Sequence, residues 1–440
     1  MKVSPMRGKA KAAAKLSTAR INCYEGSVRA GKTIGSLVEW IEFCKSGPPG
    51  TFLMAGRTER TVINNLVLPM QEMLGPDRVK INRGTGTVNI AGREVLIVGA
   101  ANELARTKIQ GLTLAAAYVD EVATTPESFF NMLTSRLSVK GAKLWCTCNP
   151  EGPGHWFKTK WLDRATLWVR HDGTIIRKDP ADYADDDPAR PINLHRVSFT
   201  LDDNAHNLDP EYVTNTKAMY SGVWFLRMIL GQWTVADGVI YDKFEPGSHV
   251  VPYDQLPTMQ RVIGLGVDYG TTNPTAGILL GIGADNRLYL IDEWSPARGT
   301  DSELSDQLSE WLAENRYEPE WIYLDPAAEN FSLQLYKDRI GRVADATNSV
   351  LPGIKLVAAL FSTDQLRVSD RCTRLLEELP GYVWDAKASR EKGVDKPIKL
   401  NDHFCDAMRY AIASAFPIWD RYLPQRIEHP KGADDAAAAA

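Results

Sequence analysis

Short apolar runs alternate with longer amphipathic or mixed segments over residues 20–150. Each run has the length of a β-strand, and the runs lie at 21–24, 51–55, 94–98, 114–119 and 143–148. Strands that alternate with helix-length segments are typical of a parallel α/β sheet. Residues 151–235 are rich in Pro, Gly, Asp and Trp and lack this alternation, so we expect a lid or linker subdomain packed beside the sheet.

A second pattern begins after residues 237–256, which are dense in turn formers and indicate a domain boundary. Three apolar runs follow with only short turns between them, at 261–268, 275–282 and 287–294. Because such turns leave no room for crossover helices, they predict an antiparallel meander. A helix-like stretch, a strand and a last periodic segment come after it, at 301–315, 321–325 and 401–415.

The prediction is two α/β domains, the first with a parallel-rich sheet and the second with a mixed sheet. Their expected bounds are a basic N-terminal segment at 1–19, a first domain at 20–235 with its lid or linker subdomain at 151–235, an interdomain linker at 236–260, a second domain at 261–418 and a tail at 419–440.

Composition places the chain among ordinary globular proteins. It has 440 residues, 44% of them hydrophobic, and 51 basic against 55 acidic side chains give a formal charge of −4. These values exclude disorder of the whole chain and a generally basic nucleic-acid coat, so DNA would have to bind in a local groove. No apolar run approaches the eighteen or so residues that span a bilayer, and the basic N-terminus lacks a signal peptide's apolar stretch. We therefore expect a cytoplasmic protein without membrane association.

Six cysteines are too sparse and irregularly spaced for a disulfide framework. Cys146 and Cys148 lie in a predicted strand and point to one face, which would allow metal binding. No second Cys/His pair has zinc-finger spacing, so buried apolar thiols are the favoured interpretation.

A phosphate-loop motif lies between the first strand and the amphipathic segment 34–43. Its positions match G-x-x-x-x-G-K-[ST] without a mismatch and are Gly26, Ser27, Val28, Arg29, Ala30, Gly31, Lys32 and Thr33. The glycines let backbone N–H groups face phosphate oxygens, and the following helix N-terminus adds positive potential. Lys32 is then expected to reach the β- and γ-phosphates, and the Thr33 hydroxyl to bind Mg²⁺.

The acidic partner of this loop is expected where the strand 114–119 ends. Asp120 can hold Mg²⁺ through water, and Glu121 can polarise the attacking water. A solvated strand end is the alternative for this pair, but the phosphate loop upstream favours the catalytic interpretation.

Further polar residues follow other strands of this block. Arg29 in the loop and Arg57 after the second strand are candidates for stabilising the γ-phosphate charge, with a surface position as the alternative for either. Asn149 follows the strand 143–148, where a polar residue can sense the γ-phosphate, although an Asn-Pro turn by itself would look the same.

Acidic residues of the second domain recur at comparable places. Asp268 ends the first strand of the meander, Asp325 ends a later strand, and Asp402, His403 and Asp406 lie on the last predicted helix. Positions 402 and 406 share one helix face. Acids from two strands and a facing helix are how a nuclease site holds two Mg²⁺ or Mn²⁺ ions about 4 Å apart. Any single member could be a cap, and Asp402 in particular, so it ranks below Asp406.

Taken together, these motifs resemble the large terminase subunit of tailed bacteriophages. The similarity rests on the order of GSVRAGKT, VDE, TCNP and DHFCDAMRYA, and it extends from about residue 20 to residue 415. It implies an N-terminal P-loop ATPase of the additional-strand, RecA-like class that translocates double-stranded DNA into a procapsid. It also implies a C-terminal RNase H-like nuclease that cuts concatemeric DNA.

The resemblance also implies roles for individual residues. Lys32 and Thr33 would bind ATP and Mg²⁺, with Arg29 as the loop arginine and Asp120 and Glu121 as the Mg²⁺-binding and catalytic acids. Residues 147–150 would couple hydrolysis to motion. Two Mg²⁺ or Mn²⁺ ions would be held by the set Asp268, Asp325 and Asp406, with His403 beside the last acid.

Partners follow from the same resemblance. They are double-stranded viral DNA, the portal protein, the small terminase subunit and the procapsid, met in the host cytoplasm during virus assembly. The chain would be a monomer in isolation and a ring on the portal. Many members carry an adenine-binding glutamine before the phosphate loop, whereas residues 1–25 contain none, which leaves Tyr24 as a substitute candidate.

Basic residues supply candidate DNA contacts. They are Lys158, Lys160, Lys387, Arg390, Lys392, Lys396 and Lys399, the last five in a lysine-rich stretch expected to form a flexible loop beside the nuclease acids. A solvated charge run is the alternative.

Two other functions compete with the packaging motor. One is a helicase or DNA-repair ATPase whose second domain is catalytically silent. The other is a slowly hydrolysing, nucleotide-dependent docking scaffold. Plasmid nicking with Mn²⁺ that is lost in Asp268→Ala would exclude the first. A Glu121→Ala variant that binds ATP but loses DNA-stimulated turnover would argue against the second.

Overall fold

The computed structural model describes residues 6–270, 273–424 and 427. The chain divides into two compact units, which are described separately. The first contains Met1–Val213, Phe225–Val235 and Lys387–Val394, and the second contains Thr214–Trp224, Ala236–Ala386 and Asp395–Ala440. The chain therefore crosses between the units several times before it ends.

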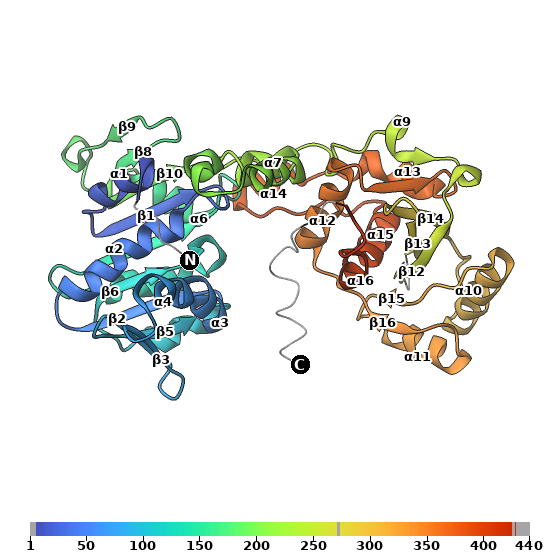
Figure 1. Ribbon diagram of the computed structural model, residues 1–440, viewed down its shortest axis with the longest axis horizontal. Coiled ribbons are helices and arrows are strands. Elements are labelled where there is room, and N and C mark those ends of the chain that lie inside the picture. Colours follow the sequence, from blue (N-terminus) through green and yellow to red (C-terminus); the bar gives the residue numbers. More distant parts are fainter. Residues whose placement is uncertain (1–5, 271–272, 425–426, 428–440) are drawn as a thin grey trace. The chain divides into compact units, whose positions relative to one another are not determined.

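A ten-stranded sheet organises the first unit, in the order β3-β4-β5-β2-β6-β7-β1-β10-β8-β9 (Figure 1). The five expected strands are all present, as β1 (Ile21–Gly26), β2 (Thr51–Gly56), β5 (Arg93–Gly99), β6 (Leu114–Val119) and β7 (Lys143–Cys148). They pair in parallel, and β1 has parallel neighbours on both sides, β7 and β10 (Ile192–Phe199). Every residue of β1 is buried, as expected of a central strand.

The sequence predicts that residues 151–235 pack beside this sheet, but part of this segment belongs to the sheet itself. They contribute β8 (Ala165–Val169), β9 (Ile175–Arg177) and β10 to it. The expectation was wrong because the Pro- and Asp-rich connections around these strands hide their short apolar runs. A hairpin of β3 (Val79–Asn82) and β4 (Thr87–Ile90) also extends the opposite edge.

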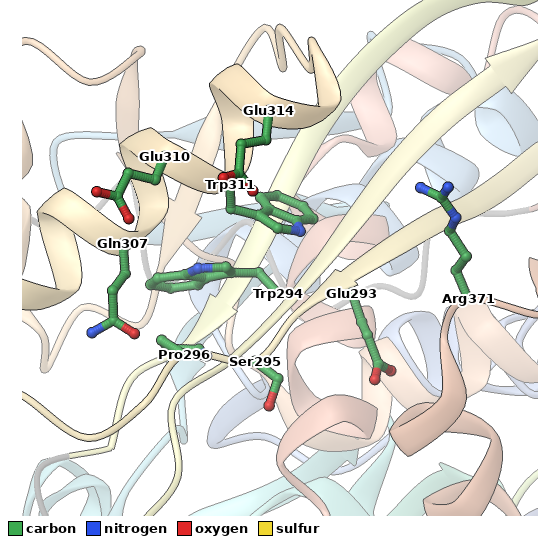
Figure 2. A pocket seen from close by; sticks show the side chains of 9 residues that line it. All are labelled: Glu293, Trp294, Ser295, Pro296, Gln307, Glu310, Trp311, Glu314 and Arg371. Atoms are coloured by element: carbon green, nitrogen blue, oxygen red, sulfur yellow. The ribbon is translucent and has the colours of Figure 1, made fainter.

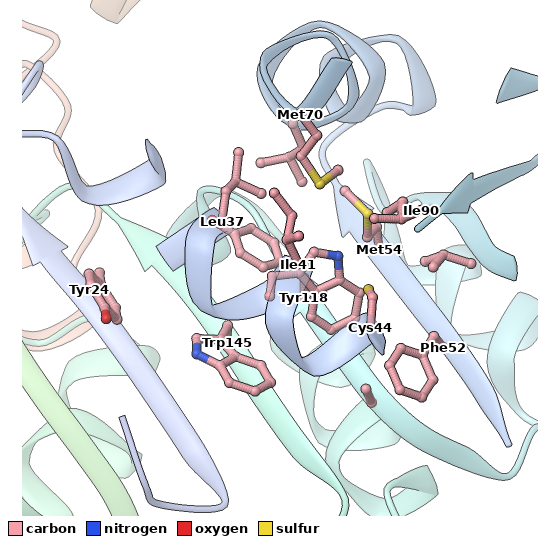
Figure 3. Packing of buried hydrophobic residues seen from close by; sticks show 14 of the residues in the cluster. Tyr24, Leu37, Ile41, Cys44, Phe52, Met54, Met70, Ile90, Tyr118 and Trp145 are labelled. Atoms are coloured by element: carbon pink, nitrogen blue, oxygen red, sulfur yellow. The ribbon is translucent and has the colours of Figure 1, made fainter. Parts of the chain in front are cut away.

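Helices cover the sheet through apolar faces. The longest is α2 (Lys32–Ser46), whose Leu37 and Ile41 pack with Tyr118 and Trp145 of the strands (Figure 3). The other helices of this unit are α1 (Gly8–Leu16), α3 (Glu59–Val62), the π-helix η1 (Ile63–Val67), α4 (Leu68–Leu74), α5 (Glu127–Arg136), α6 (Trp156–Lys160) and α14 (Ala386–Lys392), with 3-10 turns η2 (Glu103–Ile109), η3 (Val122–Thr124), η4 (Leu162–Arg164), η5 (Pro180–Asp182) and η6 (Leu201–Asn207). Two helices, α7 (Pro210–Met219) and α8 (Gly222–Met228), lie where the chain passes between the units.

A seven-stranded mixed sheet organises the second unit, in the order β11-β17-β14-β13-β12-β15-β16. The expected meander is confirmed as β12 (Met259–Asp268), β13 (Ala276–Gly283) and β14 (Leu288–Trp294), with antiparallel pairing throughout. The remaining strands pair in parallel and are β11 (Val250–Val251), β15 (Ile322–Leu324), β16 (Val343–Asp345) and β17 (Leu366–Ser369).

Helices pack on both faces of this sheet. Val267 joins the apolar cluster formed with α10 (Asp301–Asn315) and α11 (Glu329–Asp338), whereas its neighbour Gly266 faces α15 (His403–Ser414). Because side chains alternate along a strand, these are opposite faces. The remaining helices are α9 (Pro246–His249), α12 (Val350–Ser362), α13 (Thr373–Glu378) and α16 (Phe416–Trp419), with 3-10 turns η7 (Tyr253–Gln255) and η8 (Leu379–Gly381).

The expected lysine-rich loop is largely a helix. Lys387, Arg390 and Lys392 lie in α14, which belongs to the first unit and packs so closely on residues 152–155 that a Cβ on Gly154 would lie 2.2 Å from the Arg390 carbonyl oxygen. The residues of this helix are mostly good helix formers, but an isolated segment of seven residues is too short to be stable, and here Ala388 and Ser389 are buried.

Helices of the described ranges are all too short or too polar to cross a membrane. All six cysteines are buried free thiols, as the sequence predicted. Cys23 faces Cys146 across β1 and β7, and burial raises the pKa of both thiols. The three thiols Cys23, Cys146 and Cys148 therefore remain protonated and belong to the apolar core.

Gly266 tests the packing of α15 on β12. A Cβ at this position would lie 2.3 Å from the Ala407 carbonyl oxygen and 2.4 Å from the Ala411 nitrogen. Gly266→Ala should therefore lower the free energy of unfolding by about 1 to 3 kcal/mol, measured by urea denaturation. Gly381→Ala is the matched control, because nothing lies within 4 Å of its added Cβ. Equal stability of the two variants would contradict this packing.

Candidate nucleotide and metal sites

The phosphate loop connects β1 to α2 by a turn that only certain residues can form. Arg29 and Gly31 have φ angles of 53° and 82°, in the left-handed region. Gly26 is required for a different reason, because a Cβ there would lie 2.0 Å from the Phe199 carbonyl oxygen on β10. The first glycine of the motif is thus needed for close strand packing, and Gly31 for the turn into the helix.

Lys32 is held inside the loop by the chain's own oxygens. Its ammonium donates to the carbonyl oxygens of Gly26 (2.9 Å) and Ser27 and to the Asn149 side-chain oxygen (3.0 Å). Burial lowers the pKa of Lys32 to about 8, against the opposing effects of nearby groups that include Asp120 and Glu121. The sequence-predicted Lys32 and Asn149 therefore meet directly where β1 and β7 end.

Asp120 is fixed in place by two neighbours. It is 4% exposed, and its oxygens accept hydrogen bonds from the Thr147 hydroxyl (2.7 Å) and the Asn65 amide (3.0 Å). The backbone N–H of Glu121 donates to the same Thr147 hydroxyl oxygen (3.1 Å). Thr147 thus orients both acids, because β6 and β7 are parallel neighbours.

The other residues predicted for this site range from exposed to buried. Glu121 is exposed with a φ of 48°, and Arg29 is also exposed, with its carbonyl oxygen accepting from the Asn204 amide (2.7 Å). Thr33 is half-buried at the start of α2, and Arg57 is exposed after β2. Tyr24 is buried and its hydroxyl bonds to Ser17 (2.8 Å), so this residue is not available to stack on a base.

Glu25 is a buried residue beside the loop that the sequence reasoning missed. It accepts hydrogen bonds from Arg196 (2.7 Å), Trp233 (2.5 Å) and Ser198. Burial acts to raise the pKa of Glu25, but Arg196 outweighs it with help from the other donors, so the pKa lies below its ordinary value. A lone acid in an otherwise apolar strand was the available signal.

The acids of the second unit meet where two parallel strands end. Val267 of β12 pairs with Leu324 of β15, so Asp268 and Asp325 follow neighbouring strand ends. The side chain of Asp268 lies 2.9 Å from Nδ1 of His403 at the start of α15. Burial raises the pKa of Asp268 against the opposing hydrogen bond to His403, and the charge of Asp406 adds to the increase.

Cations of the same unit surround Asp406. Lys399 contacts it at 2.6 Å, and Arg409, which is 1% exposed, donates to its other oxygen at 2.8 Å. Lys399 also pairs with Asp402 at 2.9 Å. The Asp402 side chain makes no capping hydrogen bond, and the N–H groups at the start of α15 are instead bound by Glu378.

Tyr410 links the helix to the second strand acid. Its hydroxyl donates to Asp325 at 2.8 Å, and burial together with this bond raises the pKa of Tyr410. It stays a hydrogen-bond donor as a result. Sequence reasoning missed both Tyr410 and Arg409, although their positions one turn beyond Asp406 were the available signal.

The donor groups around α15 suit divalent cations. Within the described ranges, no three His, Cys, Asp or Glu side chains have the arrangement of a metal centre. The donors are nevertheless carboxylate oxygens, which Mg²⁺ and Mn²⁺ prefer, and the Lys399 ammonium occupies a position between Asp402 and Asp406 as a stand-in cation. The chemistry of the site fits such ions once Lys399 is displaced.

Thr147 tests the link between the two acids of the first unit. Thr147→Val should lower the kcat of ATP hydrolysis about ten- to hundredfold with little change in nucleotide affinity, because Asp120 and Glu121 both lose an orienting bond. Turnover and equilibrium nucleotide titration measure the two quantities. Thr147→Ser keeps the hydroxyl and should restore turnover. Loss of turnover in both variants would contradict the role of the hydroxyl.

Tyr410 provides the corresponding test in the second unit. Tyr410→Phe should weaken Mn²⁺ binding about tenfold in calorimetric titration, since Asp325 loses its orienting donor. Tyr382→Phe is the matched control, because the buried Tyr382 hydroxyl has no hydrogen-bond partner within the described ranges. The interpretation is wrong if both variants bind Mn²⁺ as the parent chain does.

Known proteins resemble both units. The family model "Terminase large subunit, T4likevirus-type, N-terminal" matches residues 23–246, and "Terminase RNaseH-like domain" matches residues 265–415. The terminase large subunit of Escherichia phage T5 is 27% identical over 303 residues, which are 66% of this chain and 62% of that relative. The match therefore spans less than two thirds of that relative's length.

Solved structures agree over a longer range. The large terminase from a thermophilic bacteriophage, in complex with ADP, is 32% identical with a TM-score of 0.76, and the match covers 93% of this chain and 99% of that one. The same protein in complex with ATP-γ-S gives 33% identity and a TM-score of 0.74 over the same shares. This chain belongs to the large terminase subunit family, the DNA-packaging motor family of phages.

Proposed function

We propose that this chain hydrolyses ATP to translocate double-stranded DNA into a procapsid and cuts concatemeric DNA with a two-metal endonuclease. The observation that carries the proposal is the presence of both residue sets on one chain: Lys32 bonded to Asn149 in the first unit, and Asp268 bonded to His403 in the second. A nucleotide motor and a nuclease are useful together only where both act on one polymer. DNA is the substrate that they can share.

The first unit would bind ATP through the phosphate loop. Lys32 would exchange its bonds to the loop carbonyls for the β- and γ-phosphates, and Thr33 and Asp120 would hold Mg²⁺. Glu121 would orient the attacking water, and Arg29 would stabilise the charge on the γ-phosphate. The ADP and ATP-γ-S complexes of the thermophilic phage's large terminase support this assignment.

Asn149 would report the state of the nucleotide. Its side-chain oxygen now accepts from Lys32 at 3.0 Å, and that bond must break or lengthen when the ammonium turns toward phosphate. Asn149 directly follows β7, whose Thr147 orients both acids. A movement of Lys32 would therefore reach the strand end that holds the hydrolytic residues.

The second unit would cut DNA at the carboxylates around α15. Asp268, Asp325 and Asp406 would hold two Mg²⁺ or Mn²⁺ ions, which would polarise the scissile phosphate and activate a water. Lys399 would leave Asp406 and be free to contact the DNA backbone. His403 would hold a proton beside Asp268, to which it is bonded at 2.9 Å.

The basic residues that are candidates for DNA contact differ in whether they already pair with a carboxylate. Four already have carboxylate partners, namely Lys158, Lys160, Lys396 and Lys399. Lys387, Arg390 and Lys392 are exposed on α14 and have no ion-pair partner in the described part of the chain. We assign the salt-sensitive backbone contacts of the first unit to these three.

Family membership supports the remaining partners. The chain would meet the portal protein, the small terminase subunit and the procapsid in the host cytoplasm, as a monomer in isolation and as a ring on the portal. The relatives from phage T5 and from the thermophilic phage, which are themselves large terminases, support this setting.

A helicase or repair-type ATPase with a silent second domain is the second candidate. It is favoured by one observation, the lack of a preformed three-residue metal arrangement within the described ranges. The two candidates differ in whether the chain itself cuts DNA.

Asp268→Asn separates these functions. The parent chain should nick supercoiled plasmid in the presence of Mn²⁺, and the variant should lose at least a hundredfold in nicking rate because a charged metal ligand is removed. ATP turnover by the variant should match the parent chain. Asp306→Asn removes an exposed charge from α10 and should leave both activities unchanged.

A parent chain that hydrolyses ATP but never nicks DNA with Mn²⁺ or Mg²⁺ would establish the helicase-type alternative. Nicking that persists in Asp268→Asn would place the nuclease chemistry elsewhere.

A further inference from the structure

A pocket of about 410 Å³ opens where β14 ends (Figure 2). Two tryptophans line it: Trp294, the last residue of β14, and Trp311 of α10. Glu310 and Glu314 of α10 and Pro296, which follows β14, also line the pocket. This set of five residues is called the tryptophan pocket below.

Trp294 offers a hydrogen bond that the chain does not use. The residue is only 2% exposed, yet its indole N–H has no acceptor in the described part of the chain. Figure 2 shows the nitrogen on the edge of the ring that faces Trp311. The nitrogen is not among the fully buried side-chain atoms that lack a partner, so it is reachable from the pocket and can donate to a group that enters, such as a peptide carbonyl oxygen.

Charge around the pocket is negative. Glu310 and Glu314 lie one turn apart, are exposed and have no basic partner within the described ranges. Arg371 also lines the pocket, but its guanidinium pairs with Asp292 at 3.3 Å and lies over the Tyr253 ring at 3.5 Å. This field repels the phosphates of DNA and attracts a cation.

The tryptophan rings and the two carboxylates of the pocket together favour one class of cationic ligand. A guanidinium or ammonium can lie over the face of Trp311 while it pairs with a carboxylate of the same helix. A bare metal ion would not use the indole rings, and an apolar ligand would not use the two carboxylates. An extended peptide segment with a basic side chain uses every group.

We propose that the tryptophan pocket docks a basic, extended segment of a partner protein. An arginine of that segment would pair with Glu310 and Glu314 over Trp311, and a neighbouring carbonyl oxygen would accept from the Trp294 N–H. Pro296 would contact the next residue of the segment. The proposal requires neither ATP hydrolysis nor DNA cleavage by this chain.

Trp294 of the pocket and the acid Asp268 lie on opposite faces of the second sheet. Trp294 is in register with Gly277 of β13, and Asp268 with the adjacent Ala276. Trp294 belongs to the apolar cluster on the α10 face, whereas Asp268 contacts His403 of α15 on the other face. A partner held in the pocket would therefore leave the carboxylates accessible.

Fluorine NMR on the full chain tests the proposal. The protein is labelled with 5-fluorotryptophan, and Trp311→Phe and Trp294→Phe identify the two resonances. The probe is the peptide acetyl-Gly-Pro-Arg-Pro-Gly-amide, and its control has citrulline in place of arginine, which keeps the shape and removes the charge. The arginine peptide should shift both resonances with a dissociation constant of about 1 mM or tighter, and the citrulline peptide should bind at least tenfold more weakly.

Paired charge variants identify the carboxylates. Glu310→Gln with Glu314→Gln should weaken the arginine peptide about tenfold, whereas Asp306→Asn with Glu318→Gln removes two exposed charges outside the pocket and should not change binding.

Three results would overturn the proposal. They are unshifted resonances at 10 mM peptide, equal binding of the citrulline peptide, and equal weakening by both double variants. Analytical ultracentrifugation adds a fourth, because self-association that is lost in Trp311→Ala would make a second copy of the chain the occupant instead.

Discussion

Parallel strand pairing is the constraint on which both clusters of functional side chains depend. In the first unit, β6, β7 and β1 lie side by side and point the same way, so Asp120, Asn149 and Lys32 reach one edge of the sheet. In the second unit, β12 and β15 do the same for Asp268 and Asp325. Residues far apart in the chain meet because each directly follows, or lies a short turn beyond, a strand of equal direction.

In both clusters, a lysine ammonium is bound by oxygen atoms of the chain itself. Lys32 is bound by loop carbonyls where phosphate oxygens are expected, and Lys399 lies between two carboxylates where metal ions are expected. In each case the chain satisfies a buried or crowded charge with its own groups. Ligand binding at either place would then be an exchange of partners for the lysine, which would keep the net cost of desolvation small.

Close backbone approach sets the geometry around these lysines. Gly26 lets the loop rest on the Phe199 carbonyl, and Gly266 lets α15 rest on β12. The first contact anchors the phosphate loop to β10, and the second holds α15 where Tyr410 bonds to Asp325 and His403 bonds to Asp268. A side chain at either glycine would displace the residues that follow it, so packing and site geometry are one problem here.

Local pattern by itself determined much of this protein. Five strands of the first sheet, the meander of the second, the helix 301–315 and the order of the motifs were all predictable, because alternation, apolar runs and turn residues act over a few neighbours. The acids and the phosphate loop could be named for the same reason, since each lies at a strand end or a helix start.

Only the tertiary structure decided which partners those residues have. The insertion of β10 beside β1, the helix at Ala386–Lys392, the bond from Tyr410 to Asp325, the capping of α15 by Glu378 and the capture of Asp406 by Lys399 all join segments that no local rule connects. Burial then shifts the pKa values of these groups, lowering that of Lys32 and raising that of Asp268. Such effects arise from contacts between distant segments and from the loss of water around them. The spacing of residues along the chain predicts neither the contacts nor the burial.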